Sequence, residues 1–216
     1  MASHEPELDG GAAGTRALLR LGVVAGPFYL AVGLTQALLR EGFDFARHPL
    51  SVLANGSWGW VQTANFVLSG LMVLAAAVGF GRVLGPKSRA FRWSLAGYGL
   101  GMILAAIFPA DPVDGFPPGT PNGMPTSIST TGLMHFVAGA LTFLMLGISG
   151  LAAAWTMMRR RHTALALLSL FSGLSVFIGF FGGIASPIGI AGIWFAVVVG
   201  WIWLAVMSLQ LQRPPS

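Results

Sequence analysis

The sequence contains no cysteine and very little charge. Only 9% of its 216 residues are Asp, Glu, Lys or Arg, whereas a soluble domain carries roughly 25%. The absence of cysteine excludes disulfides, thiolate metal sites, iron–sulfur clusters and cysteine nucleophiles. The shortage of charge excludes a soluble protein, because the surface of a soluble protein carries many charged side chains. Apolar residues make up 55% of the chain, and they predict a membrane protein.

Long apolar runs divide the chain into six predicted transmembrane helices. A helix needs about 20 apolar residues to cross a hydrocarbon core of roughly 30 Å. Five runs approach or exceed this length, but the last is too long for one crossing and contains the turn signal Ala185-Ser186-Pro187, so we divide it in two. The predicted spans cover residues 17–39, 60–80, 93–109, 133–158, 164–184 and 188–211. We expect an all-α, polytopic integral membrane helix bundle with one domain over residues 17–212, preceded by a cytoplasmic tail over residues 1–16.

The basic residues predict the orientation of these spans. With six spans, ten of the twelve basic residues fall on one side of the membrane, and only Arg40 and Arg47 fall on the other. Cytoplasmic loops carry an excess of Lys and Arg, so we expect both termini to be cytoplasmic. The net charge of +5 follows from this pattern and does not indicate nucleic-acid binding. We interpret the first apolar run as a retained span and not as a cleaved signal peptide, because it lacks a clear small-residue cleavage site.

The polar residues that could carry chemistry gather in the outer connections. The predicted spans contain no Asp, Glu, Lys or Arg in their interior, which weighs against a proton-driven pump. Pro49 and Asn55-Gly56 predict a short helix over residues 49–55. Ser129, Thr130 and Thr131 are candidate N-caps for the fourth span. The candidate site residues are Asp44, Arg47, His48, Ser51, Asp111, Asp114 and His135.

These outer residues have three possible roles: a metal or catalytic site, a ligand-binding site, or a purely structural network. Two histidines and a carboxylate form a known zinc set, so His48, Asp111 and His135 are candidate ligands of a divalent metal such as zinc. Ser51, Asp111 and His135 are candidate catalytic residues, and Asp44, Arg47, His48 and Asp114 are candidate ligand-binding residues. The third possibility is that these groups only hydrogen-bond the loops and cap the helices, because ionisable clusters are often structural. The sequence leaves this choice open.

Two stretches resemble a known bacterial membrane family. They are His48-Pro49-Leu50-Ser51, running on through Gly59-Trp60, and Phe108-Pro109-Ala110-Asp111-Pro112, followed by Thr131-Gly132 and His135. In order and surroundings they resemble the family catalogued as domain of unknown function 998, over nearly the whole chain. The resemblance implies a six-span protein of the bacterial inner (plasma) membrane. It implies no established activity, cofactor or partner.

We therefore carry three hypotheses for the function. The first is a non-enzymatic membrane protein whose outer loops bind a lipid, a small ligand or a partner. The second is a metal-dependent membrane hydrolase acting on a lipid or envelope molecule, with water activated by the metal. The third is a small transporter with a site between the fifth and sixth spans. Whether the protein is an enzyme, and its oligomeric state, are not readable from the sequence.

Overall fold

The computed structural model of the protein describes residues 5–183 and 189–212. Within these residues the structure is all-α, without a β-strand, and has six helices that are long and apolar enough to cross a membrane. The principal helices are α1 (Glu5–Leu39), α2 (Gly59–Leu84), α3 (Arg89–Ile107), α4 (Thr130–Arg159), α5 (Thr163–Phe177) and α6 (Gly189–Leu211). The short elements are η1 (Leu50–Ala54), η2 (Pro86–Ser88) and the π-helical η3 (Ile178–Gly182). The predicted fold class is confirmed, and the chain is a multi-pass membrane protein.

The helix boundaries differ from the predicted spans at several places, and α2 continues to Leu84, beyond the predicted residue 80. The expected tail, residues 1–16, is helical from Glu5 onward and runs without a break into the first span. Once a long helix exists, each further residue adds a hydrogen bond at little extra cost, and this favours the extension. The third helix begins at Arg89, earlier than the predicted Trp93. The predicted break at Ala185-Ser186-Pro187 lies outside the described residues.

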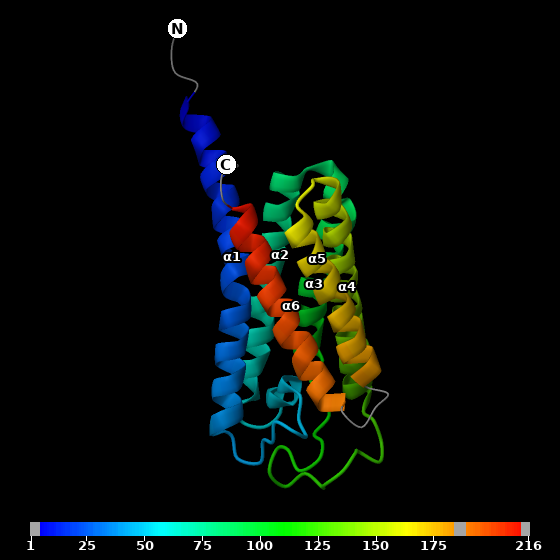
Figure 1. Ribbon diagram of the computed structural model, residues 1–216. Coiled ribbons are helices and arrows are strands. Elements are labelled where there is room, and N and C mark those ends of the chain that lie inside the picture. The colour runs from blue at the N-terminus through cyan, green and yellow to red at the C-terminus, as the bar shows by residue number, and fades with distance from the viewer. Residues whose placement is uncertain (1–4, 184–188, 213–216) are drawn as a thin grey trace.

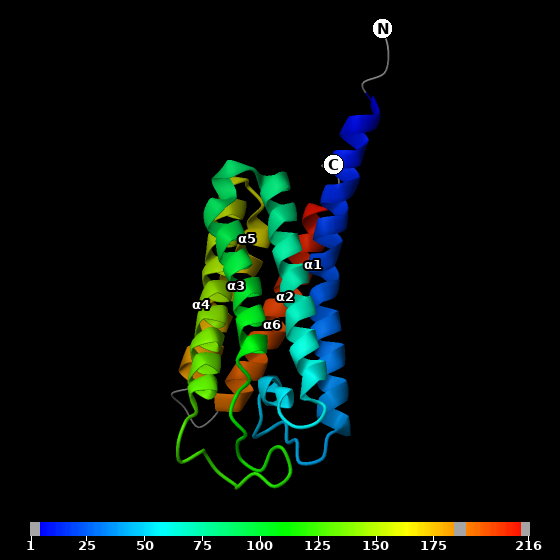
Figure 2. The same cartoon turned by 180° about the vertical axis from the view of Figure 1, so that it is seen from behind.

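The six helices form a ring in chain order (Figures 1 and 2). Each helix packs against the next one along the chain, and α6 closes the ring against α1. Large aromatic side chains fill the interior: the rings of Phe80 and Phe91 lie 4.9 Å apart, and Phe91 packs on Trp203. Trp203 is buried, and its indole Nε1 donates a hydrogen bond to Ser169 Oγ at 2.9 Å. The core therefore joins helices from both halves of the chain.

Glycine sets the spacing of α2 and α3. A Cβ atom on Gly70 would lie 2.7 Å from the Gly99 carbonyl oxygen, and a Cβ on Gly99 would lie 2.8 Å from the Gly70 carbonyl oxygen. The two backbones touch here because neither residue has a side chain, which is how membrane helices reach close packing.

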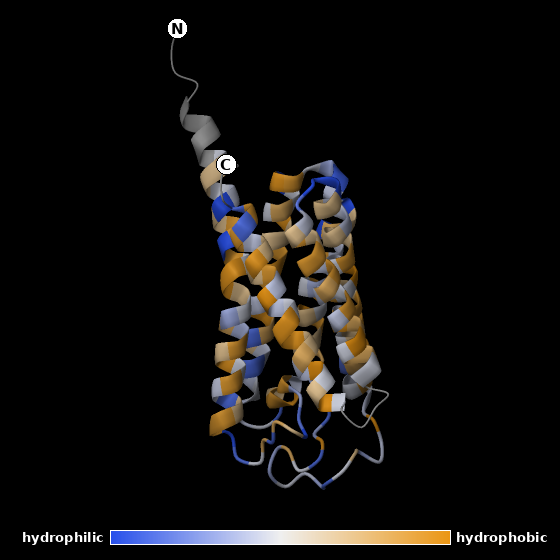
Figure 3. Cartoon of the chain, in the orientation of Figure 1, coloured by the Kyte–Doolittle hydropathy of each residue, from blue (hydrophilic) through white to orange (hydrophobic). Residues whose placement is uncertain are grey.

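The outer surface of the bundle is apolar (Figure 3). Large apolar side chains are exposed along all six principal helices, an arrangement that suits contact with hydrocarbon. Examples from the six helices are Leu38, Leu71, Leu100, Phe136, Ile178 (on η3, which continues α5) and Ile202.

The two ends of the bundle differ in chemistry. The start of α1 and the end of α6 lie at one end, and the connections over residues 40–58 and 108–129 lie at the other (Figure 1). We call the first the basic end, because the described part of the chain places these basic residues there: Arg16, Arg20, Arg82, Lys87, Arg89, Arg92, Arg159, Arg160 and Arg161. That the basic end faces the cytoplasm stays a prediction from the positive-inside rule.

Candidate functional site

The predicted site residues lie in and around a folded cap on the opposite side of the bundle from the basic end. We call residues 40–58 and 108–129 the loop cap. Its short helix η1 is the one predicted over residues 49–55, and it packs on α1 and α2 through the buried Leu50, Val52 and Leu53. The second segment lies beside it in both views of the fold (Figures 1 and 2). The loop cap is therefore a packed structure and not a loose pair of loops.

Arg47 and Asp114 tie the two segments of the loop cap together. Arg47 Nε donates to Asp114 Oδ2 at 2.8 Å, and Arg47 Nη2 makes a second, short hydrogen bond to Asp114 Oδ1. The Gly123 amide donates to the same carboxylate at 2.7 Å. The hydrogen bond from Arg47, followed by the one from Gly123, lowers the pKa of Asp114 well below its usual range, and the pairing raises the pKa of Arg47. These two predicted ligand-binding residues bind each other.

His48 is fully buried in the loop cap, and both of its ring nitrogens bond to the backbone. Nδ1 accepts the Asp44 amide hydrogen at 2.9 Å, which places the ring proton on Nε2. Nε2 donates to the Asp114 carbonyl oxygen at 3.0 Å. The ring lies next to Phe43 and Phe116, with centroids 5.4 Å and 5.6 Å away. No lone pair of this imidazole is left for a metal ion or a substrate.

Asp44 and Ser51 make fewer contacts. Asp44 Oδ1 accepts the Ala46 amide hydrogen at 2.8 Å, which is a local turn. Ser51 is half-buried on η1, and its hydroxyl has no hydrogen bond within the described part of the chain. Nucleophilic catalysis would require a base hydrogen-bonded to the serine hydroxyl, and Ser51 has no such partner among the described residues.

Asp111 holds the start of α4. Its carboxylate accepts hydrogen bonds from the Ser129 amide at 2.9 Å and from Ser129 Oγ at 2.5 Å. Ser129 Oγ in turn accepts the Gly132 amide hydrogen at 2.9 Å, so the predicted N-cap is confirmed at Ser129. A Cβ atom on Gly132 would lie 2.1 Å from Asp111 Oδ2. The position therefore needs glycine for the carboxylate to reach the cap.

His135 joins the first turns of α4 to the end of α3. Its Nδ1 lies 2.7 Å from the Phe108 carbonyl oxygen, so this nitrogen carries the proton and donates. Phe108 is the C-cap residue directly after α3, where carbonyl groups lack helical partners. The contact explains the histidine as a link between two helix ends.

The three predicted metal ligands do not converge in the structure. Among the described side chains, in residues 11–183 and 189–212, no three His, Asp or Glu residues form a set that could hold a metal ion. The reason is that each predicted ligand turns to a different partner: His48 to the backbone of the loop cap, Asp111 to Ser129, and His135 to Phe108. The predicted three-ligand site is therefore not formed. The catalytic roles of Ser51, Asp111 and His135 stay predictions.

Sequence reasoning missed Arg40 as an organising residue of the loop cap. Its Nη1 donates to the Leu53 carbonyl and its Nη2 to the Asn55 carbonyl, both at 2.6 Å. Its guanidinium also lies 4.8 Å from the ring centre of Phe116. Partial burial lowers the pKa of Arg40. An arginine directly after an apolar span was the available signal, but its partners come from turn geometry that the sequence does not display.

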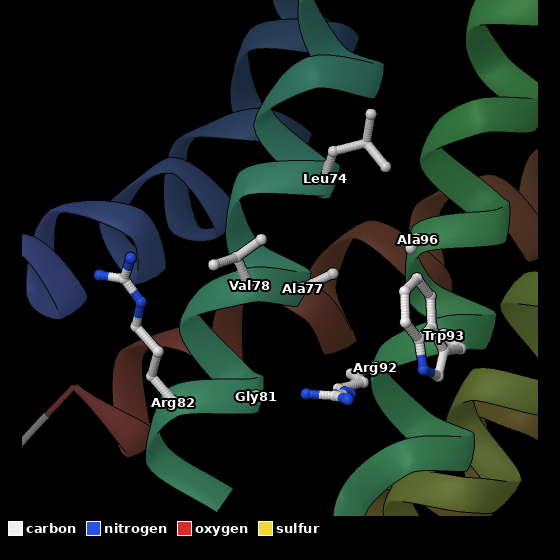
Figure 4. A pocket seen from close by; sticks show the side chains of 8 residues that line it. All are labelled: Leu74, Ala77, Val78, Gly81, Arg82, Arg92, Trp93 and Ala96. Atoms are coloured by element: carbon white, nitrogen blue, oxygen red, sulfur yellow. The ribbon is translucent and has the colours of Figure 1, made fainter. Parts of the chain in front are cut away.

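A groove between α2 and α3 at the basic end was also missed. It has a volume of about 420 Å³, within the range of roughly 300–1,000 Å³ that small-molecule sites occupy. Leu74, Ala77 and Val78 from α2 and Ala96 from α3 form its apolar walls (Figure 4). Val78 is about half exposed, so the groove is on the lipid-facing surface.

Two arginines and a tryptophan border this groove at the membrane interface. Arg92 lies beside Gly81, where a Cβ atom would come within 3.2 Å of the arginine side chain (Figure 4). Its guanidinium lies 5.4 Å from the ring centre of Trp93, and its buried Nε has no hydrogen-bond partner among the described residues. Arg82 extends from α2 toward α1 (Figure 4). Among the side chains that the structure describes, in residues 11–183 and 189–212, neither arginine pairs with a carboxylate, so both guanidinium groups are open to an anionic partner.

The comparisons with known proteins place the chain in a family without assigning it an activity. Residues 23–210 match the family described as "Protein of unknown function (DUF998)". The searches of curated proteins and of solved structures found no match. The match begins within α1 and ends within α6, so it includes the four helices between them, the loop cap and the groove. The chain therefore belongs to the DUF998 family of proteins of unknown function.

Proposed function

We propose that this protein is a non-enzymatic membrane protein that binds an anionic phospholipid in the groove between α2 and α3. The carrying observation is the combination of an apolar groove with the unpaired guanidinium of Arg92 at its end. Arginine forms charge-assisted hydrogen bonds with phosphate oxygens. A phospholipid has an acyl chain that suits the apolar walls and a phosphate that suits the arginines.

The position of the groove favours a lipid over a soluble anion. Its walls face the hydrocarbon region, and Trp93 and the two arginines lie where side chains reach headgroups. Basic residues near a bilayer surface attract anionic lipids by about 1 kcal/mol each. Lys87 lies at the same end and adds to this attraction. We therefore take the ligand to be a lipid of the leaflet at the basic end.

The loop cap supports binding over hydrolysis. His48 and Asp114 are engaged by other groups of the chain, and Asp111 and His135 Nδ1 bond to Ser129 and Phe108. A hydrolase would need at least one of them directed toward a substrate. These residues stabilise the folded loop cap.

The test is lipid retention in detergent, measured by native mass spectrometry. Protein would be mixed with phosphatidylglycerol or with phosphatidylcholine, which differ in net charge. We expect preferential retention of phosphatidylglycerol, and we expect Arg92→Gln to weaken that retention about tenfold, since losing one charge-assisted contact of about 1.4 kcal/mol changes an equilibrium by that factor. Ala96→Leu, which fills the groove and keeps its charge, should weaken it as well.

Arg89→Gln is the matched control, because Arg89 is exposed at the same end and does not line the groove. Equal losses in Arg89→Gln and Arg92→Gln would show that only general surface charge matters and would overturn the proposed site. Equal retention of the two lipids would do the same. Displacement of the lipid by inorganic phosphate alone would indicate an anion site and not a lipid site.

A further inference from the structure

A set of neutral polar side chains lies inside the bundle, between α1 and α2. Its members are Gln36 on α1 and Gln62, Asn65 and Ser69 on α2. Gln36 is 8% exposed and the other three are at most 1% exposed. Neither water nor lipid headgroups reach such a position freely, so each polar atom needs a partner inside the protein. These residues are separate from the loop cap and from the groove.

The hydrogen bonds within this set fix the orientation of each amide. The Tyr29 carbonyl oxygen can only accept, so the atom of Asn65 that lies 3.0 Å from it is the amide nitrogen. The same nitrogen lies 3.2 Å from Gln62, which must therefore present its oxygen. Gln36 Nε2 then donates to that oxygen at 3.0 Å and to the Val32 carbonyl at 3.4 Å. Rotating the side-chain amide of either glutamine by 180° would place two donors or two acceptors opposite each other.

Two atoms remain unpaired once these bonds are counted. Gln62 Oε1 accepts two hydrogen bonds, and the amide nitrogens of Asn65 and Gln36 each have two acceptors. Gln36 Oε1 and Gln62 Nε2 are both buried and have no hydrogen-bond partner among the described residues. One of these atoms only accepts and the other only donates. The two side chains that carry these atoms are hydrogen-bonded to each other through their remaining amide atoms.

A single hydroxyl oxygen satisfies both atoms. It can donate its hydrogen to Gln36 Oε1 and accept a hydrogen from Gln62 Nε2. Two to four polar partners are what an ordered buried water requires. The rest of the surroundings are aromatic, since Tyr29 packs on Phe66 and Trp201, and no charged group takes part in the set.

We infer that Gln36 and Gln62 form a binding site for one neutral hydroxyl group inside the membrane-embedded bundle. Its source is either a water molecule or the alcohol group of a lipid, and both use the same two hydrogen bonds. The site does not depend on the proposed phospholipid groove, which is lined by other residues of α2 and by α3.

The test is a structure of the full chain in detergent at a resolution that shows ordered water, together with mass spectrometry of the copurified lipids. We expect density for an oxygen within hydrogen-bonding distance of both Gln36 Oε1 and Gln62 Nε2. An isolated peak identifies water, whereas a peak continuous with elongated density, together with a stoichiometric alcohol-bearing lipid, identifies a lipid. The inference is overturned by an empty site, or by rotated amides that bond directly to each other.

Gln36→Met is the variant that separates the site from general packing, because it keeps an unbranched side chain and removes the acceptor. We expect the oxygen density to be lost in this variant. It should persist in Thr142→Val, in which a buried hydroxyl of α4 bonded only to its own helix is removed. If Gln36→Met does not fold, the wild-type density alone decides. Persistence of the peak in a folded Gln36→Met protein contradicts the assignment.

Discussion

Arg47, in the first segment of the loop cap, binds the carboxylate of Asp114, in the second segment, through hydrogen bonds from both Nε and Nη2. The two residues are 67 positions apart in the chain, so this contact closes a long loop. Arginine suits the task because its planar fork matches the two oxygens of a carboxylate. The backbone carbonyl oxygen of Asp114 accepts a hydrogen bond from His48 Nε2. One residue therefore anchors the second segment to the first through both its side chain and its backbone.

The first prediction concerns the pH dependence of the loop cap. The pKa of Asp114 is lowered in the folded protein, so its pairing stabilises the fold fully above the ordinary carboxyl pKa of about 3.9. That contribution is lost as the pH falls below this value toward the lowered pKa. We expect the melting temperature of the wild type to fall more steeply than that of Asp114→Asn between neutral and strongly acidic pH. Asp44→Asn, which removes a carboxylate with only a local turn contact, should keep the wild-type slope, and equal slopes in all three proteins would contradict the prediction.

The second prediction concerns Arg40. Replacing it with Gln should lower the free energy of unfolding by about 1.5–3 kcal/mol, the typical contribution of hydrogen bonds from a charged group. Arg40→Lys should restore only part of this, because an ammonium group lacks the fork that reaches two carbonyls. Hydrogen exchange should localise the effect to residues 50–56, where the Leu53 and Asn55 carbonyls are released. Uniform exchange across the bundle would mean that Arg40 does not act through η1.

The third prediction uses two glycines of α4. Gly132→Ala should destabilise the protein by about 1–3 kcal/mol, because the new Cβ displaces Asp111 and breaks the Ser129 cap. Gly139→Ala is the matched control, since a Cβ there meets nothing within 4 Å. It should be neutral or stabilising by about 0.5–1 kcal/mol, the usual gain of Ala over Gly in a helix. Chemical denaturation of both variants measures the difference, and similar effects would rule out the steric argument.

The fourth prediction concerns His48 and bound metal. His48→Phe should keep the aromatic packing but leave the Asp44 amide and the Asp114 carbonyl without partners, at about 1–3 kcal/mol for each unsatisfied group. The metal content of protein purified without chelator should be the same in this variant and in the wild type, because both imidazole nitrogens already bond to the backbone. One zinc ion per wild-type chain that is lost in His48→Phe or His135→Ala would restore the metallohydrolase hypothesis.

Hydropathy was sufficient to predict the six helices, because a helix must hide its own backbone in lipid and needs a fixed length of apolar residues to do so. Local signals also worked where the partners are near in sequence. Ser129 caps α4 as predicted, and η1 forms where Pro49 and Asn55-Gly56 indicate a short helix. In each case the determining interaction spans only a few residues.

The candidate site was harder to predict, because its contacts join segments far apart in the chain. The types and order of His48, Asp111 and His135 suit a metal, but the sequence cannot say where each ring or carboxylate points. The structure turns all three toward nearby backbone or a serine. The sequence does not indicate the groove, because Arg82 and Arg92 only predict the orientation of the spans. They come close to Ala77 and Ala96 only when α2 packs on α3.

The ring order of the helices has a consequence for assembly. Among the described residues, helices α1 to α5 pack mainly on their neighbours in the chain, and the contact between α1 and α6 closes the ring. Proteins rich in contacts between nearby residues pay little loop-closure entropy before each contact forms. Successive helical hairpins can therefore pack while the chain is being synthesised. The ring closes when α6 packs against α1. A chain that stops before α6 would leave the aromatic interior open on one side, so synthesis of the C-terminal helix marks the point at which the bundle becomes complete.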